Sequence, residues 1–161
     1  TGDRVEIAGS HERGHLDTER RRKRGKDVEH LAHGECLLQL LVQRDDGWVD
    51  MQVQFLIDKK TAGADHVVGW TVLKPGASHE RHLHTSCDEF FMVLKGRGHI
   101  ITGDGLEPAG EGDVAYSPRG CWHGFNNTSD EDVVLVWGWM GAGSIEASGY
   151  EVPEEKVGNR E

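Results

Sequence analysis

Two histidines and a carboxylate lie close together in the centre of the sequence. His82 and His84 are one residue apart, and Glu89 follows at the start of the apolar run 90–94. Side chains alternate between the two faces of a strand, so His82 and His84 point the same way if this stretch is extended. Neutral imidazoles and a carboxylate are ligands that iron, manganese, nickel, cobalt and zinc accept. The spacing therefore predicts a transition-metal site, closed by a loop that brings Glu89 beside the two histidines.

A second stretch offers a fourth ligand. Pro118 and Gly120 indicate a tight turn, and His123 follows that turn. With four protein ligands, an octahedral metal keeps two adjacent positions for a substrate that chelates through two oxygens, or for a substrate and dioxygen. The alternative is a set of polar residues that only form hydrogen bonds on a barrel rim, but the joint spacing disfavours it.

Taken together, the two stretches resemble the two sequence motifs of the cupin superfamily. The first motif has Gly76, His82, His84, Glu89 and Gly96, and the second has Gly112, Pro118, Gly120, His123 and Asn127. The resemblance covers about residues 67–139. It implies an all-β fold, an antiparallel jelly-roll β-barrel, that binds one divalent transition metal through His82, His84, Glu89 and His123. It also implies a homodimer, since such barrels commonly pair.

The composition limits the classes of protein to which the chain can belong. Its 161 residues suit one domain, and 22 glycines suit a β-rich domain with many turns. A formal net charge of −10 argues against a nucleic-acid partner. Three cysteines, an odd number, favour a reduced, cytoplasmic setting over a disulfide framework. No apolar run of membrane-spanning length occurs, so no membrane association is expected. No Rossmann or P-loop glycine pattern is present, so no organic cofactor is expected.

The pattern along the chain divides it into three parts. Residues 1–30 hold eight Lys/Arg and seven Asp/Glu and are predicted to form a polar, flexible arm. Residues 31–141 are predicted to form the barrel. Residues 142–161 are predicted to be a C-terminal tail, although residues 144–150 could instead form a short cover over the barrel mouth.

Short apolar segments separated by turn residues predict the strands. The sequence favours strands at 36–42, 51–57, 67–73, 90–94, 99–102, 113–117 and 133–140, and residues 122–125 carry His123. Lys74-Pro75-Gly76 is expected to end one strand, and Gly96-Arg97-Gly98 is expected to form a tight hairpin. Strands at this spacing indicate a sandwich or barrel.

Three residues before the first metal ligand are the candidate catalytic residues. His79, Glu80 and Arg81 could orient a substrate or act as a base, although loop charges of this kind are often solvated. Asp88 could hold a ligand by a hydrogen bond. His99 is expected to be an ordinary strand residue, and Cys121 a bystander with a small chance to offer a soft ligand.

The aromatic residues have two interpretations. Phe91 shares the strand face of Glu89 and is predicted to point inward. Several others could line an apolar pocket or simply fill the core, namely Trp70, Trp122, Phe125, Trp137 and Trp139. Their number favours an apolar or aromatic small-molecule substrate.

These observations predict a metal-dependent enzyme. The leading hypothesis is an Fe(II) dioxygenase that cleaves a small hydroxylated aromatic or dicarbonyl compound, with Mn, Ni, Co or Zn as other possible metals. The first alternative is a redox-neutral isomerase, lyase, decarboxylase or polyketide-cyclase-like enzyme. The second is a non-catalytic small-molecule-binding protein, which the presence of all four ligands disfavours.

Overall fold

A computed structural model describes residues 38–41, 48–103 and 105–154, with side chains described from residue 51 onward. The predicted arm at 1–30 lies outside these residues. The elements are β1 (Leu38–Leu41), β2 (Trp48–Ile57), β3 (His66–His84), β4 (Asp88–Lys95), β5 (Arg97–Thr102), β6 (Gly105–Gly110), β7 (Val114–Ser117), β8 (His123–Asn126), β9 (Val133–Met140), α2 (Ile145–Ser148) and β10 (Tyr150–Glu151).

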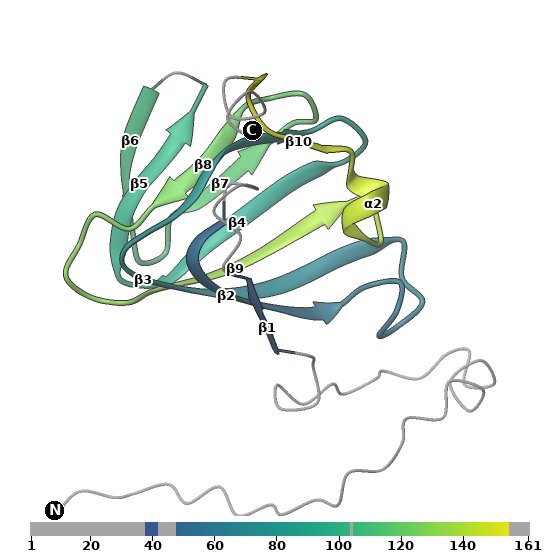
Figure 1. Ribbon diagram of the computed structural model, residues 1–161, viewed down its shortest axis with the longest axis horizontal. Coiled ribbons are helices and arrows are strands. Elements are labelled where there is room, and N and C mark those ends of the chain that lie inside the picture. The colour runs from purple at the N-terminus through teal and green to yellow at the C-terminus, as the bar shows by residue number, and fades with distance from the viewer. Residues whose placement is uncertain (1–37, 42–47, 104, 155–161) are drawn as a thin grey trace, which may run out of the picture. The chain divides into compact units, whose positions relative to one another are not determined.

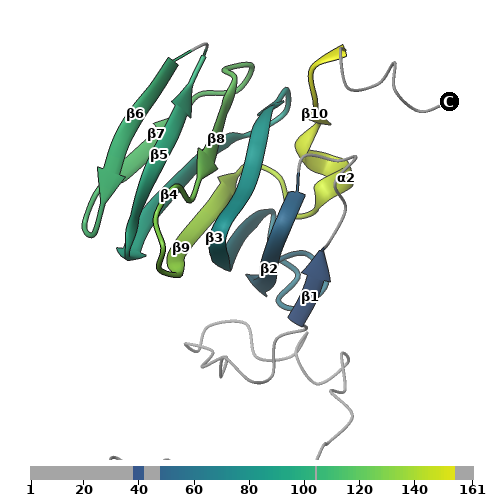
Figure 2. The same ribbon diagram turned by 60° about the vertical axis from the view of Figure 1, so that its left-hand side comes forward.

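The strands form one curled antiparallel sheet. The order is β6-β5-β8-β3-β9-β4-β7, and β2 and β10 also pair with β3, while β1 pairs with β2. Figures 1 and 2 show the sheet folded over, with β5, β6 and β8 in one layer and β4, β7 and β9 in the other. The all-β, antiparallel jelly-roll fold expected from the sequence is confirmed.

Strand β3 joins the two layers. Its first half, His66–Leu73, pairs with β9, and Ser78–His82 pair with β8. The expected strand end at residues 74–76 is wrong, because β3 continues through this segment to His84. Gly76 takes a φ of 78°, which bends the strand without breaking it, and its N–H donates to the Asn127 carbonyl. The continuous strand carries the histidines from the core to the other layer.

The predicted hairpin at residues 96–98 is also wrong. Strand β4 pairs with β7 and β9, whereas β5 pairs with β6 and β8, so the chain crosses between layers at Gly96. Gly96 has a φ of 84°, and a Cβ there would lie 2.8 Å from the Asp132 carbonyl oxygen. The sequence suggested a hairpin because residues 96–98 lie between two short apolar segments. Local sequence does not show which strands pair, so it could not reveal the crossing. The true hairpin is the β5–β6 turn between Thr102 and Gly105.

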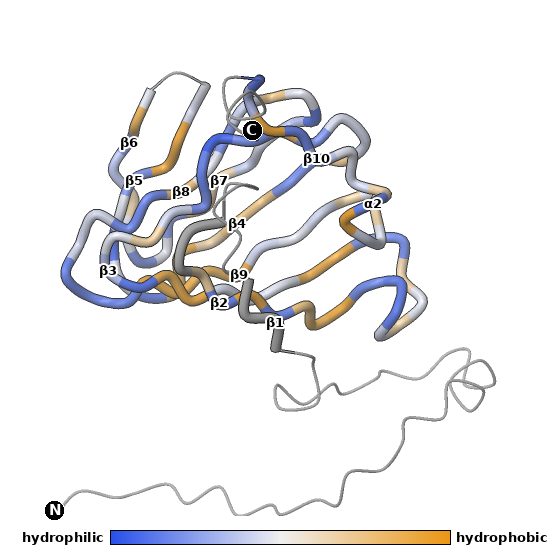
Figure 3. Tube along the Cα trace, in the orientation of Figure 1, coloured by the Kyte–Doolittle hydropathy of each residue, from blue (hydrophilic) through white to orange (hydrophobic). Residues whose placement is uncertain are grey.

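The core lies between the two layers and is built from every second residue of the strands. In β9, for example, Leu135, Trp137 and Trp139 are buried. The Phe55 ring packs edge-on against Trp137, with centroids 5.4 Å apart. Figure 3 shows hydrophilic residues gathered in the connections, such as those between β2 and β3 and between β8 and β9.

Asn127 ties the bend of β3 to the loop that follows β8. Its side-chain amide donates to the carbonyls of Leu73, Lys74 and Glu131, and its Oδ1 accepts from the backbone N–H and the hydroxyl of Ser129. The residue is 2% exposed. Asn127 therefore holds two segments that flank the strand of His123.

The C-terminal segment returns to the barrel. Ser144 caps α2, Gly149 ends it in the left-handed conformation with φ 65°, and Tyr150 then pairs with His84 of β3. Residues 144–151 therefore return to the barrel and contact it through the pairing of β10 with β3 (Figure 1). Among the described residues, no helix has the length and hydrophobicity needed to cross a membrane.

Candidate metal centre

Four side chains from three strands converge at one end of the barrel interior. His82 and His84 come from β3, Glu89 from β4 and His123 from β8. All four side chains are buried, and one donor atom from each lies within 4.8 Å of the other three. The structure therefore brings together the whole set that the spacing predicted.

The Glu89 carboxylate lies at the centre of the set. Its Oε2 is 2.8 Å from His84 Nε2, 3.1 Å from His123 Nε2 and 3.7 Å from His82 Nε2. Two ligand atoms that occupy neighbouring positions about 2.1 Å from an octahedral metal ion lie about 3 Å from each other, which is close to the 2.8 Å and 3.1 Å separations found here. The buried Nε2 atoms of His82 and His84 form no hydrogen bond with any described residue. Donor types, spacing and burial all fit a transition-metal ion, and the role of these residues as ligands stays a prediction.

Backbone carbonyls orient two of the three imidazoles. Nδ1 of His82 lies 2.8 Å from the Glu80 carbonyl oxygen, and Nδ1 of His123 lies 2.8 Å from the Cys121 carbonyl oxygen. Each Nδ1 can therefore carry the proton and donate it, which leaves Nε2 as the metal-binding atom. His84 has no such acceptor among the described residues.

Trp139 orients the carboxylate, a role that the sequence did not reveal. Its indole Nε1–H donates to Glu89 Oε2 over 3.0 Å, and the two residues are partners in the β4–β9 register. Only the strand pairing places Trp139 beside Glu89, so no signal in the sequence alone separates it from the other core tryptophans.

Trp139→Phe is expected to weaken metal binding by about 10- to 100-fold, because Glu89 loses the donor that fixes its orientation. A chelator competition titration measures this. Trp137→Phe is the matched control, since Trp137 Nε1 donates to Thr71 Oγ1 and not to a ligand. Equal affinities for the two variants would contradict the role of Trp139.

Charge and burial set the protonation states in the metal-free protein. Burial raises the pKa of Glu89, but the hydrogen bond with His123 and the close contacts with His82 and His84 together outweigh burial, so its pKa lies well below the ordinary value. Burial lowers the pKa of His82 to about 4, although Glu89 opposes this shift. For His123, burial lowers the pKa, but the hydrogen bond to Glu89, the charge of that carboxylate and the hydrogen bond to the Cys121 carbonyl together outweigh burial, so the pKa lies above its ordinary value.

Metal affinity is expected to fall about tenfold per pH unit below the pKa of His123, because the metal must displace the proton on this imidazole. His82 takes up a proton that the metal must also displace only near pH 4, where the pKa of His82 lies. Titrations with Co²⁺ between neutral and mildly acidic pH measure the slope. In the Glu89→Gln variant, metal affinity should begin to fall only at a lower pH, because His123 loses the carboxylate that raises its pKa. An affinity independent of pH over this range would contradict the assignment.

The structure separates the three candidate catalytic residues. His79 stacks on His82, with ring centroids 3.9 Å apart, and it lines the cavity next to the donor atoms. Glu80 contributes its backbone carbonyl to His82, and the Arg81 guanidinium lies 5.1 Å from the centroid of the Trp122 ring. Neither Glu80 nor Arg81 lines this cavity. His79 is therefore the one of the three that the fold places at the site.

A small cavity of about 20 Å³ adjoins the donor atoms. His79, His82, Glu89 and His123 form its polar side, together with Thr71. The remaining lining is Met51, Phe91, Gly124, Phe125, Leu135 and Trp137. Phe91 points inward as predicted. Thr71 Oγ1 already accepts from Trp137, so the wall beyond the donor atoms is largely apolar.

Tyr150 borders the histidines from the C-terminal strand. As the register partner of His84 it points to the same side of the sheet, and its ring centroid lies 5.0 Å from that of His82 and 5.6 Å from that of His84. From the sequence, Tyr150 could be predicted only as part of a cover or tail, because strand β10 is too short to give a periodic signal.

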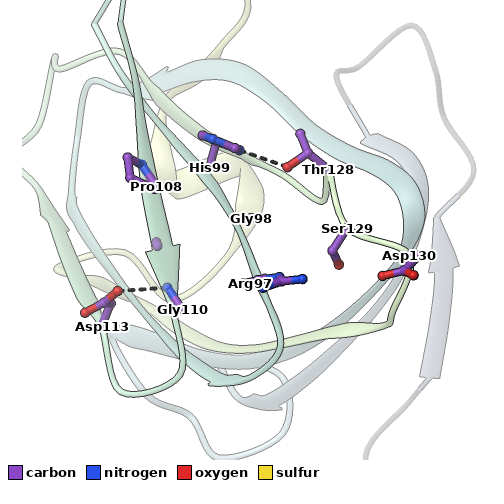
Figure 4. Close-up of a pocket in the computed structure, with 10 residues that line it drawn as sticks. Arg97, Gly98, His99, Pro108, Gly110, Asp113, Thr128, Ser129 and Asp130 are labelled. Carbon is purple, nitrogen blue, oxygen red and sulfur yellow. Dashed lines mark hydrogen bonds between the residues drawn. The ribbon is translucent and has the colours of Figure 1, made fainter.

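Other polar residues named from the sequence support the site or lie elsewhere. Asp88 accepts from the backbone and side chain of Arg119 and from the Tyr116 hydroxyl, so it anchors the turn that precedes His123 rather than a ligand. The exposed Cys121 contributes only its carbonyl. His99 lies outside the cluster in a surface groove, where its Nδ1 is 2.9 Å from Thr128 Oγ1 (Figure 4).

Known proteins share this sequence pattern and fold. The sequence model of the cupin domain family matches residues 69–139. Protein SchB of Streptomyces halstedii is 31% identical over 86 residues, which are 53% of this chain and 62% of SchB. The chain spans about half to three-fifths of the length of the curated relatives that it matches.

Two solved structures illustrate the likeness in fold. The polyketide cyclase RemF of Streptomyces resistomycificus has a TM-score of 0.60 at 22% identity and covers 70% of this chain and 79% of its own. A cupin-2 domain protein of Rhodospirillum rubrum has a TM-score of 0.63 at 19% identity, with 83% and 85% covered. With the motif spacing, the barrel and the clustered ligands, the family match identifies residues 69–139 as a cupin domain.

Proposed function

We propose that the protein is a metal-dependent enzyme that removes a proton from the carbon next to a carbonyl group in a small, largely apolar substrate. The reaction proposed first is redox-neutral, of the polyketide-cyclase or isomerase type. The single observation that carries this proposal is the position of His79. Its imidazole is not a candidate metal ligand, but it lines the same cavity as three of the four candidate ligands.

His79 has the properties of a base at neutral pH. Burial lowers its pKa, and the positive charge that His82 can carry lowers it further, so the pKa lies well below 6.5. The imidazole is therefore neutral and able to accept a proton. In the proposed reaction the carbon–hydrogen bond breaks, His79 takes the proton, and the electron pair moves to the carbonyl oxygen.

The remaining residues bind and orient the substrate. A divalent metal, when bound, would supply Lewis-acid stabilisation of negative charge on the substrate oxygen. Among the described residues that line the cavity, there is no lysine or arginine and Glu89 is the sole acid. The wall formed by Phe91, Phe125 and Trp137 thus favours a neutral, apolar or aromatic keto compound. The small volume limits the group that reaches the donor atoms to the reacting end of the substrate.

The likeness to RemF, described as a polyketide cyclase, favours the redox-neutral form of the proposal. The three-histidine, one-carboxylate set favours a second candidate, a dioxygenase that cleaves a hydroxylated aromatic or dicarbonyl compound, because it leaves two adjacent positions on an octahedral metal. Fe(II) is the metal proposed first, with Mn, Ni, Co and Zn as alternatives. Elemental analysis of protein from its own host distinguishes them.

We place the enzyme in the cytoplasm, where free thiols persist. Cys87 and Cys121 are both free, and burial raises the pKa of the Cys87 thiol to about 11, which keeps it unreactive.

Deuterium incorporation into 2-hydroxyacetophenone, followed by NMR in D₂O under strict anaerobiosis, tests the proposal. Metal-loaded protein should accelerate exchange, and His79→Ala should lower the rate by about 10²- to 10⁴-fold with metal content retained. His99→Ala is the matched control and should not change the rate. Equal rates for His79→Ala and the unsubstituted protein would contradict the role of His79. If instead 4-methylcatechol is consumed with an equal amount of oxygen and no anaerobic exchange occurs, the dioxygenase candidate takes its place.

A further inference from the structure

His79 and Tyr150 form the side of the metal centre that lies nearest to solvent. Of the eleven residues that line the small cavity, ten are buried and His79 is half-buried. The ring of the half-buried Tyr150 lies beside that of His79, with centroids 6.4 Å apart and an angle of 8° between the two ring planes. The described side chains therefore place the entrance of the cavity where these two nearly parallel rings meet.

The cavity is too small to hold a whole substrate. Its volume of about 20 Å³ corresponds to about one water molecule. A ketone whose oxygen and reacting carbon reach the donor atoms must therefore extend outward, past His79 and along Tyr150. The group attached to the other side of the carbonyl carbon then lies in the entrance, so the entrance decides which substrates fit.

The segment that carries Tyr150 is tied to the barrel next to the metal ligands. We call residues 144–151, which comprise α2 and β10, the C-terminal strap. The N–H and the hydroxyl of Thr85 both donate to the Gly149 carbonyl, over 3.0 and 3.2 Å. The next residue in the strap, Tyr150, pairs with His84 of β3. These contacts fix the Tyr150 ring relative to the histidines, so the ring is a wall of the entrance and not a lid.

The close approach of the strap to the barrel depends on Gly149. This residue has a φ of 65°, and a Cβ there would lie 2.1 Å from Thr85 Oγ1. A side chain at this position would therefore push the strap, and Tyr150 with it, away from the histidines.

The shape of the entrance favours a flat substituent. An aromatic ring stacks on a planar, conjugated group, whereas a saturated ring is thicker and has no π-face. We infer that Tyr150 is a specificity-determining residue that, together with His79, binds a planar aryl or other conjugated group next to the substrate carbonyl. This inference rests on the proposed function, because it names the substrate class of the same site.

The affinities of two ketones that differ only in the saturation of their ring test this inference. 2-Hydroxyacetophenone carries a flat phenyl ring, and cyclohexyl hydroxymethyl ketone carries a saturated ring of the same size. Ligand-observed NMR titrations of the full, zinc-loaded chain under nitrogen measure both dissociation constants. The unsubstituted protein should prefer the phenyl ketone. Tyr150→Leu should raise the dissociation constant of the phenyl ketone about 5- to 10-fold and leave that of the cyclohexyl ketone within about twofold. Tyr150→Phe should keep the preference, because the ring remains.

Gly149→Ala tests the same wall without a change of the Tyr150 side chain. It should displace the strap and reduce the preference for the phenyl ketone by a similar factor. Gly112→Ala is the matched control, since Gly112 also has a positive φ, of 89°, but a Cβ there would meet no described atom within 4 Å. Phe90→Leu is the control for loss of an aromatic ring, because Phe90 is half-buried on the outer face of β4. Both controls should keep the preference.

Equal changes for the two ketones in Tyr150→Leu would overturn the inference. So would an unchanged affinity for 2-hydroxyacetophenone in both Tyr150→Leu and Gly149→Ala, or an unsubstituted protein that does not prefer the phenyl ketone. Near-ultraviolet circular dichroism and metal content establish that each variant is folded.

The proposed function fails on a different result. Selective binding of the phenyl ketone without any deuterium exchange would contradict proton removal and leave the assignment of Tyr150 intact. Exchange that depends on His79, combined with unaltered selectivity in Tyr150→Leu, would contradict only the role of Tyr150.

Discussion

Replacing His84 by alanine is expected to remove bound metal almost completely, with a loss of affinity of about 1000-fold, or about 4 kcal/mol. His84 Nε2 is the donor atom closest to Glu89 Oε2, at 2.8 Å, and it is buried there without the alignment of a hydrogen bond. Its loss leaves two imidazoles and a carboxylate with an open side next to Trp139, whose ring lies 5.0 Å from that of His84. The three remaining ligands therefore hold the ion much less tightly, because one coordination position is left to water.

Elemental analysis and a chelator titration measure this effect in the folded variant. His99→Ala is the matched control, because His99 is also a strand histidine but binds Thr128 outside the cluster. The control should keep full metal content and affinity. Stoichiometric, tightly bound metal in His84→Ala would place the metal site elsewhere in the protein.

Asn127→Ala is expected to lower the free energy of unfolding by about 3 kcal/mol. The substitution leaves the carbonyls of Leu73, Lys74 and Glu131 without the amide that now donates to them, in a position that is 2% exposed. Buried carbonyls that lose their donor cost more than an average hydrogen bond contributes. The bend of β3 at Gly76 would also lose one of its attachments.

Urea unfolding of the apo-protein measures this change. Asn126→Ala is the control, since the half-buried Asn126 side chain accepts one hydrogen bond, from the Ser78 hydroxyl. It should cost about 1 kcal/mol. Equal losses for the two variants would mean that the Asn127 network does not hold the two segments together.

The ligand set could be predicted from the sequence because each ligand is close to a local signal. His82 and His84 share a strand face by parity, and the Pro118 turn precedes His123. The strand β9 was also predicted with its observed bounds, since its apolar run is long and ends in turn residues. Local spacing and turn chemistry are therefore enough to locate the donor atoms.

What the sequence could not supply depends on which strands pair. The continuity of β3 through Gly76 depends on a hydrogen bond to Asn127, and the crossing at Gly96 depends on the pairing of β5 with β8, so both rely on residues more than 20 positions away. The same is true of the contact between Trp139 and Glu89, which are 50 residues apart. Tyr150 belongs to a strand of two residues, too short for any periodic pattern. These features are set by long-range register, which composition and spacing do not encode.

The strand order has a consequence for biosynthesis. His84 and Glu89 are five residues apart in the chain, but β9, which begins at Val133, lies between their strands in the sheet. A chain leaves the ribosome from its N-terminus, so β3 and β4 emerge well before the strand that joins them. The histidine pair and the carboxylate are therefore fixed relative to each other only late in translation, after His123 has also emerged. Incomplete chains then offer no finished binding site, and metal insertion becomes a step that follows synthesis of nearly the whole domain.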